Sequence, residues 1–289
     1  MRNNYLKRIK ISDILMNTFL IAFGIIILYP FYNSILVSIV PQEVYVKTPF
    51  MLYPPELNFA SYKFVFSSNT IANGFKVTLF ILVFGVLYNM ILTVMTAYAL
   101  TKPIPGRKYF SFFIIFTMYF SGGLIPLYIL IQKLGLLNNI LSMILPTGIN
   151  ISFMLIIMKF FDEIPKELEE SAKIDGANEM VILFKIVLPL SLPVLATFAL
   201  YYGVERWNEW WHGMLFIKSS TKLPLQMVLK NIIQDTNILM ANIPDDAKKE
   251  VFTDGIKMAS VVITMFPVMC LYPFLQRYFI TGLTTGAIK

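Results

Sequence analysis

The chain has 289 residues, of which 57% are hydrophobic and only 14% charged, and its mean hydropathy of +0.68 excludes an ordinary soluble domain. The single cysteine and the single histidine exclude a disulfide framework and a thiolate or imidazole metal cluster within the chain, so no metal site is predicted. The net charge of +7 does not indicate nucleic acid as a partner, because the basic residues are spread over all loops without forming a stripe.

Six apolar runs are long enough to cross a bilayer, whose hydrocarbon core of ~30 Å needs about 20 helical residues. They are Ile14–Val40, Lys76–Leu100, Tyr109–Ile131, Ile140–Phe161, Ile186–Val204 and Met258–Phe279. The first run follows a basic amino terminus, but it is too long for a signal peptide and lacks a cleavage site, so we interpret it as a retained helix. The sequence predicts an all-α integral membrane protein with six transmembrane helices in a single domain, residues 1–289.

The loops indicate the orientation of these helices. Basic residues gather in residues 1–10 and 101–108, and short basic loops stay on the cytoplasmic side, so both termini are predicted to be cytoplasmic. Residues 41–75 then lie outside, where four prolines predict an extended strap rather than helices. Residues 205–257 form an extracytoplasmic segment that is too polar to span the membrane. Residues 162–189 form the longest cytoplasmic loop.

This cytoplasmic loop contains the stretch "EESAKIDGANEMVILFKIVLP", Glu169–Pro189. Pro165 suits the first turn of a helix, Gly176 ends that helix, and a second helical segment starts near Asn178. One interpretation is a pair of amphipathic helices lying on the inner membrane surface. However, the loop is net acidic, whereas interfacial helices favour Lys and Arg, and the small residues around Gly176 allow another backbone to approach closely. We therefore predict a docking turn.

The same loop resembles a family signature. Glu170-Ser171-Ala172, three residues, Gly176, nine residues and then Ile186-x-Leu188-Pro189 is similar to the E-A-A-x3-G-x9-I-x-L-P motif of binding-protein-dependent ABC importer permeases, departing only at Ser171. The segments "SGGLIPLYILIQKLGLLNN", "WNEWW" and "YPFLQRYFITGLTTGAIK" resemble the carbohydrate-importing branch, in particular its lipoprotein-dependent subgroup in Gram-positive bacteria.

The resemblance implies a type I ABC importer permease fold in a bacterial plasma membrane. It implies as partners a second permease in a heterodimer, two cytoplasmic ATPase subunits and an extracytoplasmic solute-binding lipoprotein, besides membrane lipid. It also implies that the loop forms coupling helices that dock in the ATPase. The expected ATPase-coupling residues are Glu170, Ser171, Ala172, Asp175, Gly176, Ile186, Leu188 and Pro189.

The sequence carries no G-x4-G-K-[ST] phosphate loop, so the chain is not expected to bind ATP by that route or to be an enzyme. ATP and Mg would belong to the partner ATPase, and no cofactor is expected on this chain. The resemblance implies a second candidate contact with the ATPase, the tail Gly282–Lys289, and the alternative is a disordered terminus.

Sugars bind through amide and hydroxyl groups and through aromatic stacking. Candidates at membrane depth for a substrate path are Asn89, Tyr119, Asn150, Tyr201 and Tyr202. The alternative is that the amides tie helices together, each interhelical bond being worth about 0.6 kcal/mol. Glycine and proline interrupt the third run at 121–126 and the fourth at 146–150, where broken helices line a cavity or pack closely.

Residues at the outer end of the fifth run admit structural explanations. Trp207, Trp210 and Trp211 favour an aromatic belt at the interface over stacking on a sugar ring. Glu205 and Arg206 are expected to pair with each other or to extend towards water.

Two other classes of protein agree less well with the sequence. An ion-coupled secondary transporter usually needs buried ionisable residues near the membrane midplane, and the apolar runs contain essentially none away from their ends. An intramembrane enzyme needs a nucleophile with a base or a metal site. Neither explains the charged loop. The sequence therefore predicts a permease subunit of an ATP-driven importer that moves a carbohydrate, an oligosaccharide or glycoside, by alternating access, with the secondary transporter as the alternative.

Overall fold

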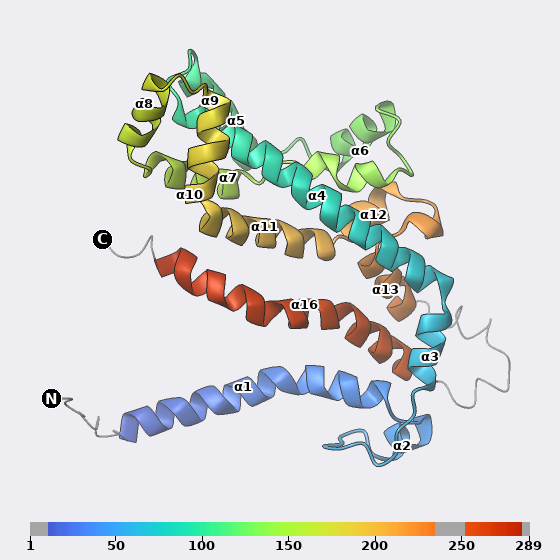
Figure 1. Cartoon of the computed structure of the whole chain (residues 1–289). Coiled ribbons are helices and arrows are strands. Elements are labelled where there is room, and N and C mark those ends of the chain that lie inside the picture. Colours follow the sequence, from blue (N-terminus) through green and yellow to red (C-terminus); the bar gives the residue numbers. More distant parts are fainter. Residues whose placement is uncertain (1–10, 235–251, 285–289) are drawn as a thin grey trace. The chain divides into compact units, whose positions relative to one another are not determined.

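The computed structural model describes residues 11–234 and 252–284, with side chains placed through Cys270, and this part of the chain is helical without any β-strand (Figure 1). In chain order the elements are α1 Ile11–Ser38, α2 Gln42–Lys47, α3 Ala60–Ser67, α4 Asn69–Thr101, α5 Arg107–Tyr119, α6 Leu124–Lys133, the 3-10 turns η1 Ile140–Met143 and η2 Leu145–Thr147, α7 Ile151–Asp162, α8 Lys166–Ile174, α9 Glu179–Ile182, the π-helical turn η3 Leu183–Val187, α10 Leu188–Leu190, α11 Leu192–Trp207, α12 Trp211–Phe216, the 3-10 turn η4 Ser220–Lys222, α13 Leu225–Gln234 and α16 Thr253–Thr284. The predicted all-α fold is confirmed.

Long apolar helices account for three of the expected spans, namely α1, α4 and the first part of α16. Three bent pairs account for the others: α5 with α6 at 114°, η1 and η2 with α7 at 50°, and the segment α9 to α10 with α11 at 85°. Counted as one span each, the bent pairs bring the total within the described residues to six, in agreement with the six apolar runs.

Two of the breaks occur where the sequence predicted them. Gly123 precedes α6 with a φ of +90°, a conformation that costs glycine little. Pro146 sits in η2, and Asn150 then caps α7, because its side-chain oxygen accepts from the N–H groups of Ser152 and Phe153. The third break, at Ser191 before α11, was not predicted from the sequence.

The prediction of an extended strap over residues 41–75 was wrong. The structure contains α2 and α3 there, and α4 already begins at Asn69. Only residues 48–59 lack a helix, and three of the four prolines lie in that stretch. The fourth, Pro41, occupies the N-cap position of α2, where its missing N–H costs nothing.

The chain divides into two compact units, residues 1–67 with 232–263 and residues 68–231 with 264–289. In the first unit, a small core forms around Leu36, Val40 and Met51. In the second, α4, α7 and α11 pack around a larger core that continues into the loop after α7. Its fully buried members include Ala97, Met154, Ile157 and Ile182. The elements around the charged loop therefore belong to one core.

The expected extracytoplasmic segment, residues 205–257, begins within α11 and contains α12, η4 and α13, while residues 235–251 lie outside the described residues. Its residues before Ile232 pack on the first half of α4. The N–H of Leu225 donates to the Thr78 hydroxyl at 2.8 Å, and a Cβ added at Gly74 would lie 3.1 Å from Val228. Close packing thus fixes this part of the segment on α4.

Candidate functional site

The charged loop has the two-helix form that the sequence predicted. Helix α8 ends in a Schellman motif, in which the N–H of Ala177 donates to the carbonyl of Ala172 at 2.9 Å and the N–H of Gly176 to that of Lys173 at 3.0 Å. Gly176 has a φ of +83°, so the motif favours glycine there. A Cβ at Gly176 would meet nothing within 4 Å. The turn is therefore open for another protein to approach.

Helix α9 begins directly after this turn. The side chain of Asn178 accepts from the N–H of Val181 at 2.9 Å, so Asn178 is the N-cap of α9, and the segment starts where the sequence predicted. The π-helical turn η3 follows, and its residues Leu183 and Val187 are buried in the core shared with α4 and α7. The loop is thus anchored at its second helix and exposed at its turn.

An ion-pair cluster ties the loop to α4. Lys102, the C-cap residue directly after α4, pairs with Glu169 of α8 and lies 3.7 Å from the carboxylate of Glu179. Its ammonium also lies 4.3 Å from the centre of the Tyr98 ring, and the Tyr98 hydroxyl donates to Glu179 at 2.8 Å. Lys173 completes the cluster at 2.7 Å from Glu179. One lysine of α4 therefore bridges both helices of the loop.

The hydrogen bond to Glu179, followed by the charge of that carboxylate, raises the pKa of Lys173 above its ordinary value. The ion pair with Glu179 favours the charged form of Lys173 and contributes to holding α8 against α9.

The expected coupling residues divide into two groups. Glu170, Ser171, Asp175, Gly176 and Pro189 are exposed, whereas Ala172, Ile186 and Leu188 are partly buried and pack against the core. The first group, apart from Pro189 in α10, surrounds the turn, and the second holds the loop in place.

Sequence reasoning missed Ile174, whose side chain is 87% exposed at the end of α8. The available signal was a large apolar side chain between the charged residues Lys173 and Asp175, next to a glycine turn.

The predicted path residues fall into different environments. Asn89, on α4, is fully buried, and its amide donates to the carbonyls of Thr147 and Gly148. Tyr202, on α11, is also buried, and its hydroxyl accepts from the backbone N–H of Asn150 at 2.9 Å. The structure thus brings three of the five predicted residues to the break before α7.

The other two predicted path residues have different surroundings. Tyr201 is half-buried against the rings of Phe153 and Phe198. Tyr119 is 82% exposed at the end of α5. Asn150 is half-buried, and its amide lies 3.5 Å from the exposed carboxylate of Glu205.

The expectation for Arg206 was wrong. This side chain neither extends towards water nor forms an ion pair with Glu205 among the described residues, because it is only 3% exposed and its guanidinium donates to Asn89 and to backbone carbonyls. The sequence signal was an arginine placed directly before a tryptophan at the end of an apolar run.

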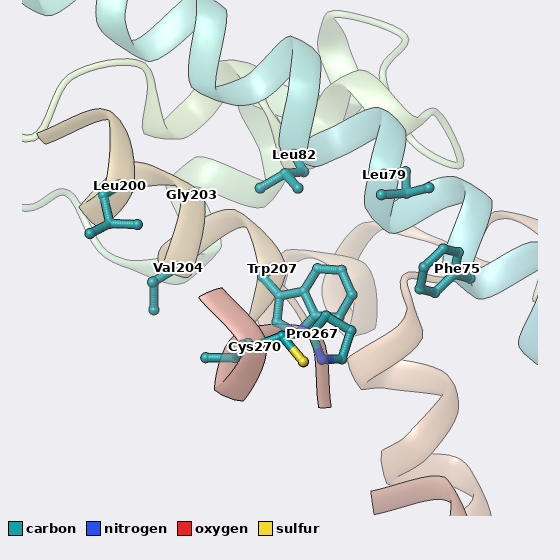
Figure 2. A pocket seen from close by; sticks show the side chains of 10 residues that line it. Phe75, Leu79, Leu82, Leu200, Gly203, Val204, Trp207, Pro267 and Cys270 are labelled. Carbon is teal, nitrogen blue, oxygen red and sulfur yellow. The ribbon is translucent and has the colours of Figure 1, made fainter. Parts of the chain in front are cut away.

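Trp207 does not belong to an interfacial belt. It is 6% exposed, its indole N–H donates to the carbonyl of Thr264 at 3.2 Å, and its ring meets that of Phe75 edge to face. It lines an apolar pocket of about 360 Å³ formed by α4, α11 and α16, in which Cys270 also lies (Figure 2). Trp210 and Trp211 remain partly exposed and pack on each other.

This fold and loop define a class of protein. The chain belongs to the family of binding-protein-dependent transport system inner membrane components, whose model matches residues 10–285. It is a permease subunit of an ABC importer, with the type I permease fold and no catalytic centre of its own, which confirms the family, fold and class predicted from the sequence.

Individual relatives cover nearly the whole chain. It is 37% identical over 282 residues to the polygalacturonan/rhamnogalacturonan transport system permease protein YtcP of Bacillus subtilis, covering 97% of this chain and 99% of that protein. It is 29% identical over 293 residues to the arabinooligosaccharides transport system permease protein AraQ of Halalkalibacterium halodurans, with 97% and 99% covered.

A solved structure is similar over the same length. It is a crystal structure of a bacterial ABC transporter involved in the import of the acidic polysaccharide alginate, with 31% identity and a TM-score of 0.86, and the match covers 96% of this chain and all of that one.

Proposed function

We propose that this chain forms, with a second and different permease, the membrane path of an importer that moves an oligosaccharide or glycoside into the cell. An extracytoplasmic lipoprotein delivers the sugar, and two cytoplasmic ATPases bind ATP and Mg and supply the energy. Both termini lie in the cytoplasm, as the basic residues in 1–10 and 101–108 predict. Residues 1–10 lie outside the described residues. The names of the relatives, which transport oligosaccharides and polysaccharides, support the carbohydrate.

The coupling role is supported by the way in which the charged loop is attached to the rest of the chain. Its exposed turn presents Gly176, acidic side chains and the apolar Ile174, while its second helix is fixed in the core and its first is tied to α4 by Lys102. A flexible loop would absorb a displacement of the ATPase, whereas this one transmits it to α4, α7 and α11. The tail after Thr284, the second candidate contact, lies outside the described residues.

The substrate path is proposed to include Asn150, Tyr201 and Tyr119, which are at least partly accessible, rather than Asn89 and Tyr202. The exposed Glu205 carboxylate beside Asn150 adds an acceptor for sugar hydroxyls. In a completed transporter a carboxylate at this depth would face water or protein, because exposure to lipid is costly.

The test is to purify the tagged chain from its native membrane with the proteins bound to it, and to identify these by mass spectrometry. A second permease, an ATPase and a lipoprotein are expected. Reconstitution of that complex should give sugar uptake that requires ATP. Uptake driven by an ion gradient without ATP would support the secondary transporter instead.

A further inference from the structure

Arg206 is a buried charge that the coupling loop and the sugar path do not use. Its Nε and Nη2 atoms donate to the side-chain oxygen of Asn89 at 3.0 and 2.8 Å, Nη1 donates to the carbonyl of Met143 at 2.8 Å, and Nη2 also donates to that of Thr147 at 2.9 Å. Charged residues within membrane spans are costly and are usually functional. The guanidinium must therefore be explained by what it holds.

It holds the break in the fourth span. Before α7 the backbone passes through the two short 3-10 turns η1 and η2, the second of which contains Pro146, and such a break leaves carbonyls without the donors of a continuous helix. Arg206 and Asn89 supply donors to the carbonyls of Met143, Thr147 and Gly148. A fork with five N–H groups suits several acceptors at once.

A second contact fixes the other side of the break. The hydroxyls of Tyr202 and Thr93 lie 2.7 Å apart, and Tyr202 accepts from the backbone of Asn150, where α7 begins. Tyr202 and Arg206 are four residues apart on α11, as are Asn89 and Thr93 on α4, so each pair shares one helix face. Both ends of the break are thereby held between α4 and α11.

The backbone of α4 makes room for this arrangement. A Cβ added at Gly85 would lie 2.9 Å from Cδ and 3.0 Å from Nε of Arg206. Even a methyl group there would displace the guanidinium without removing its charge. The absence of a side chain at Gly85 therefore leaves the space that the Arg206 side chain occupies.

We propose that Arg206 is a positioning residue that locks the broken fourth span to α4 and α11, so that a displacement of the coupling loop reaches the outer ends of these helices. This inference rests on the proposed function. Helix α7 leads into the loop and α11 leads out of it, so the loop and the lock lie at opposite ends of the same two helices. If the lock is loosened, ATP hydrolysis proceeds without a matching movement of the path.

The experiment compares Arg206→Lys, Arg206→Gln and Gly85→Ala with Gly24→Ala, a control in α1 where an added Cβ meets nothing within 4 Å. Each variant is assembled into the complete transporter and reconstituted, and sugar uptake is measured per ATP hydrolysed. In assembled complexes of the three lock variants the ratio should fall at least about fivefold, the lower end of typical coupling energies, while Gly24→Ala keeps it. A purely structural role would lower the amount of assembled complex and leave the ratio unchanged.

A second measurement does not depend on transport. Cys270 is the sole cysteine of the sequence and lines the pocket formed in part by Trp207, the neighbour of Arg206 (Figure 2). Its side chain is exposed, so its reaction with N-ethylmaleimide in detergent reports on the pocket, and the rate of alkylation should differ between the lock variants and the unmodified chain. If the unmodified complex shows no ATP-dependent uptake, the proposed function fails. The role of Arg206 is then tested by the Cys270 alkylation rates alone. Unchanged uptake per ATP, unchanged alkylation in that case, or failure of all three variants to assemble would overturn the inference.

Discussion

Lys102, directly after α4, and Glu179, at the start of α9, meet at Tyr98: the Lys102 ammonium lies over the Tyr98 ring, and the Tyr98 hydroxyl donates to the same Glu179 carboxylate oxygen that Lys102 approaches. The loop is therefore held by side-chain contacts with the end of α4 as well as by the backbone at its two ends. Glu169 provides the matching contact from α8.

We expect Lys102→Met to loosen the loop, because it leaves two carboxylates near each other without their shared cation. Partly exposed ion pairs are worth up to about 1 kcal/mol each, so the chain should still fold. Hydrogen exchange of the α8 and α9 amides should become faster, and uptake should fall at constant membrane level. The matched control is Lys108→Met, an exposed lysine at the start of α5. Unchanged exchange in α8 would show that Lys102 does not hold the loop.

Gly176→Glu should abolish ATPase recruitment. It places a charged side chain at an open turn and adds strain of about 1–2 kcal/mol, because its φ of +83° disfavours residues with a Cβ. Gly176→Asn is the control for strain, since asparagine tolerates this conformation. Recruitment is measured by co-purification of the ATPase at equal membrane level. Normal recruitment and uptake with Gly176→Glu would sink the coupling role of the turn.

Ile174→Ser should weaken ATPase binding without destabilising the chain. The side chain is 87% exposed, so the fold loses almost no burial, whereas burying an isoleucine in a partner is worth about 1.5–3 kcal/mol. Leu168→Ser, on the same helix and 44% exposed, serves for comparison. If both variants bind the ATPase like the unmodified chain, neither Ile174 nor Leu168 is part of the docking surface.

The isolated chain should neither bind nor hydrolyse ATP, because its sequence lacks a phosphate loop. The measurement is nucleotide binding and phosphate release by the purified subunit, with the complete complex as the positive control. Turnover by a preparation free of other ATPases would contradict the assignment of energy supply to partner subunits.

The predictability of this fold varied with the physical signal. Hydropathy located the spans. Gly176 and Asn178 predicted where one helix of the loop ends and the next begins, because helix ends depend on local backbone preferences rather than on tertiary packing. The helices in residues 41–67 were missed because prolines mark only where helices start or stop. Arg206 was misjudged because its partners, Asn89 and the carbonyl of Met143, are 117 and 63 residues away in the chain. Such contacts depend on the packing of three helices, which periodicity does not reveal.

Asn89 and Asn150, which sequence reasoning treated alike, should respond differently to substitution. Asn89→Leu removes the acceptor of a buried guanidinium, and hydrogen bonds to charged groups are worth about 1.5–3 kcal/mol, so assembly should be lost. Asn150→Ser keeps an oxygen that can cap α7 but removes the amide that lies near Glu205. It should assemble normally and raise the sugar concentration needed for half-maximal uptake, as should Tyr201→Phe if its hydroxyl contacts the sugar. Both measurements require uptake curves over several sugar concentrations, with thermal stability of the complex as the check on folding. If Asn150→Ser and Tyr201→Phe transport like the unmodified protein, the sugar contacts lie on the partner permease.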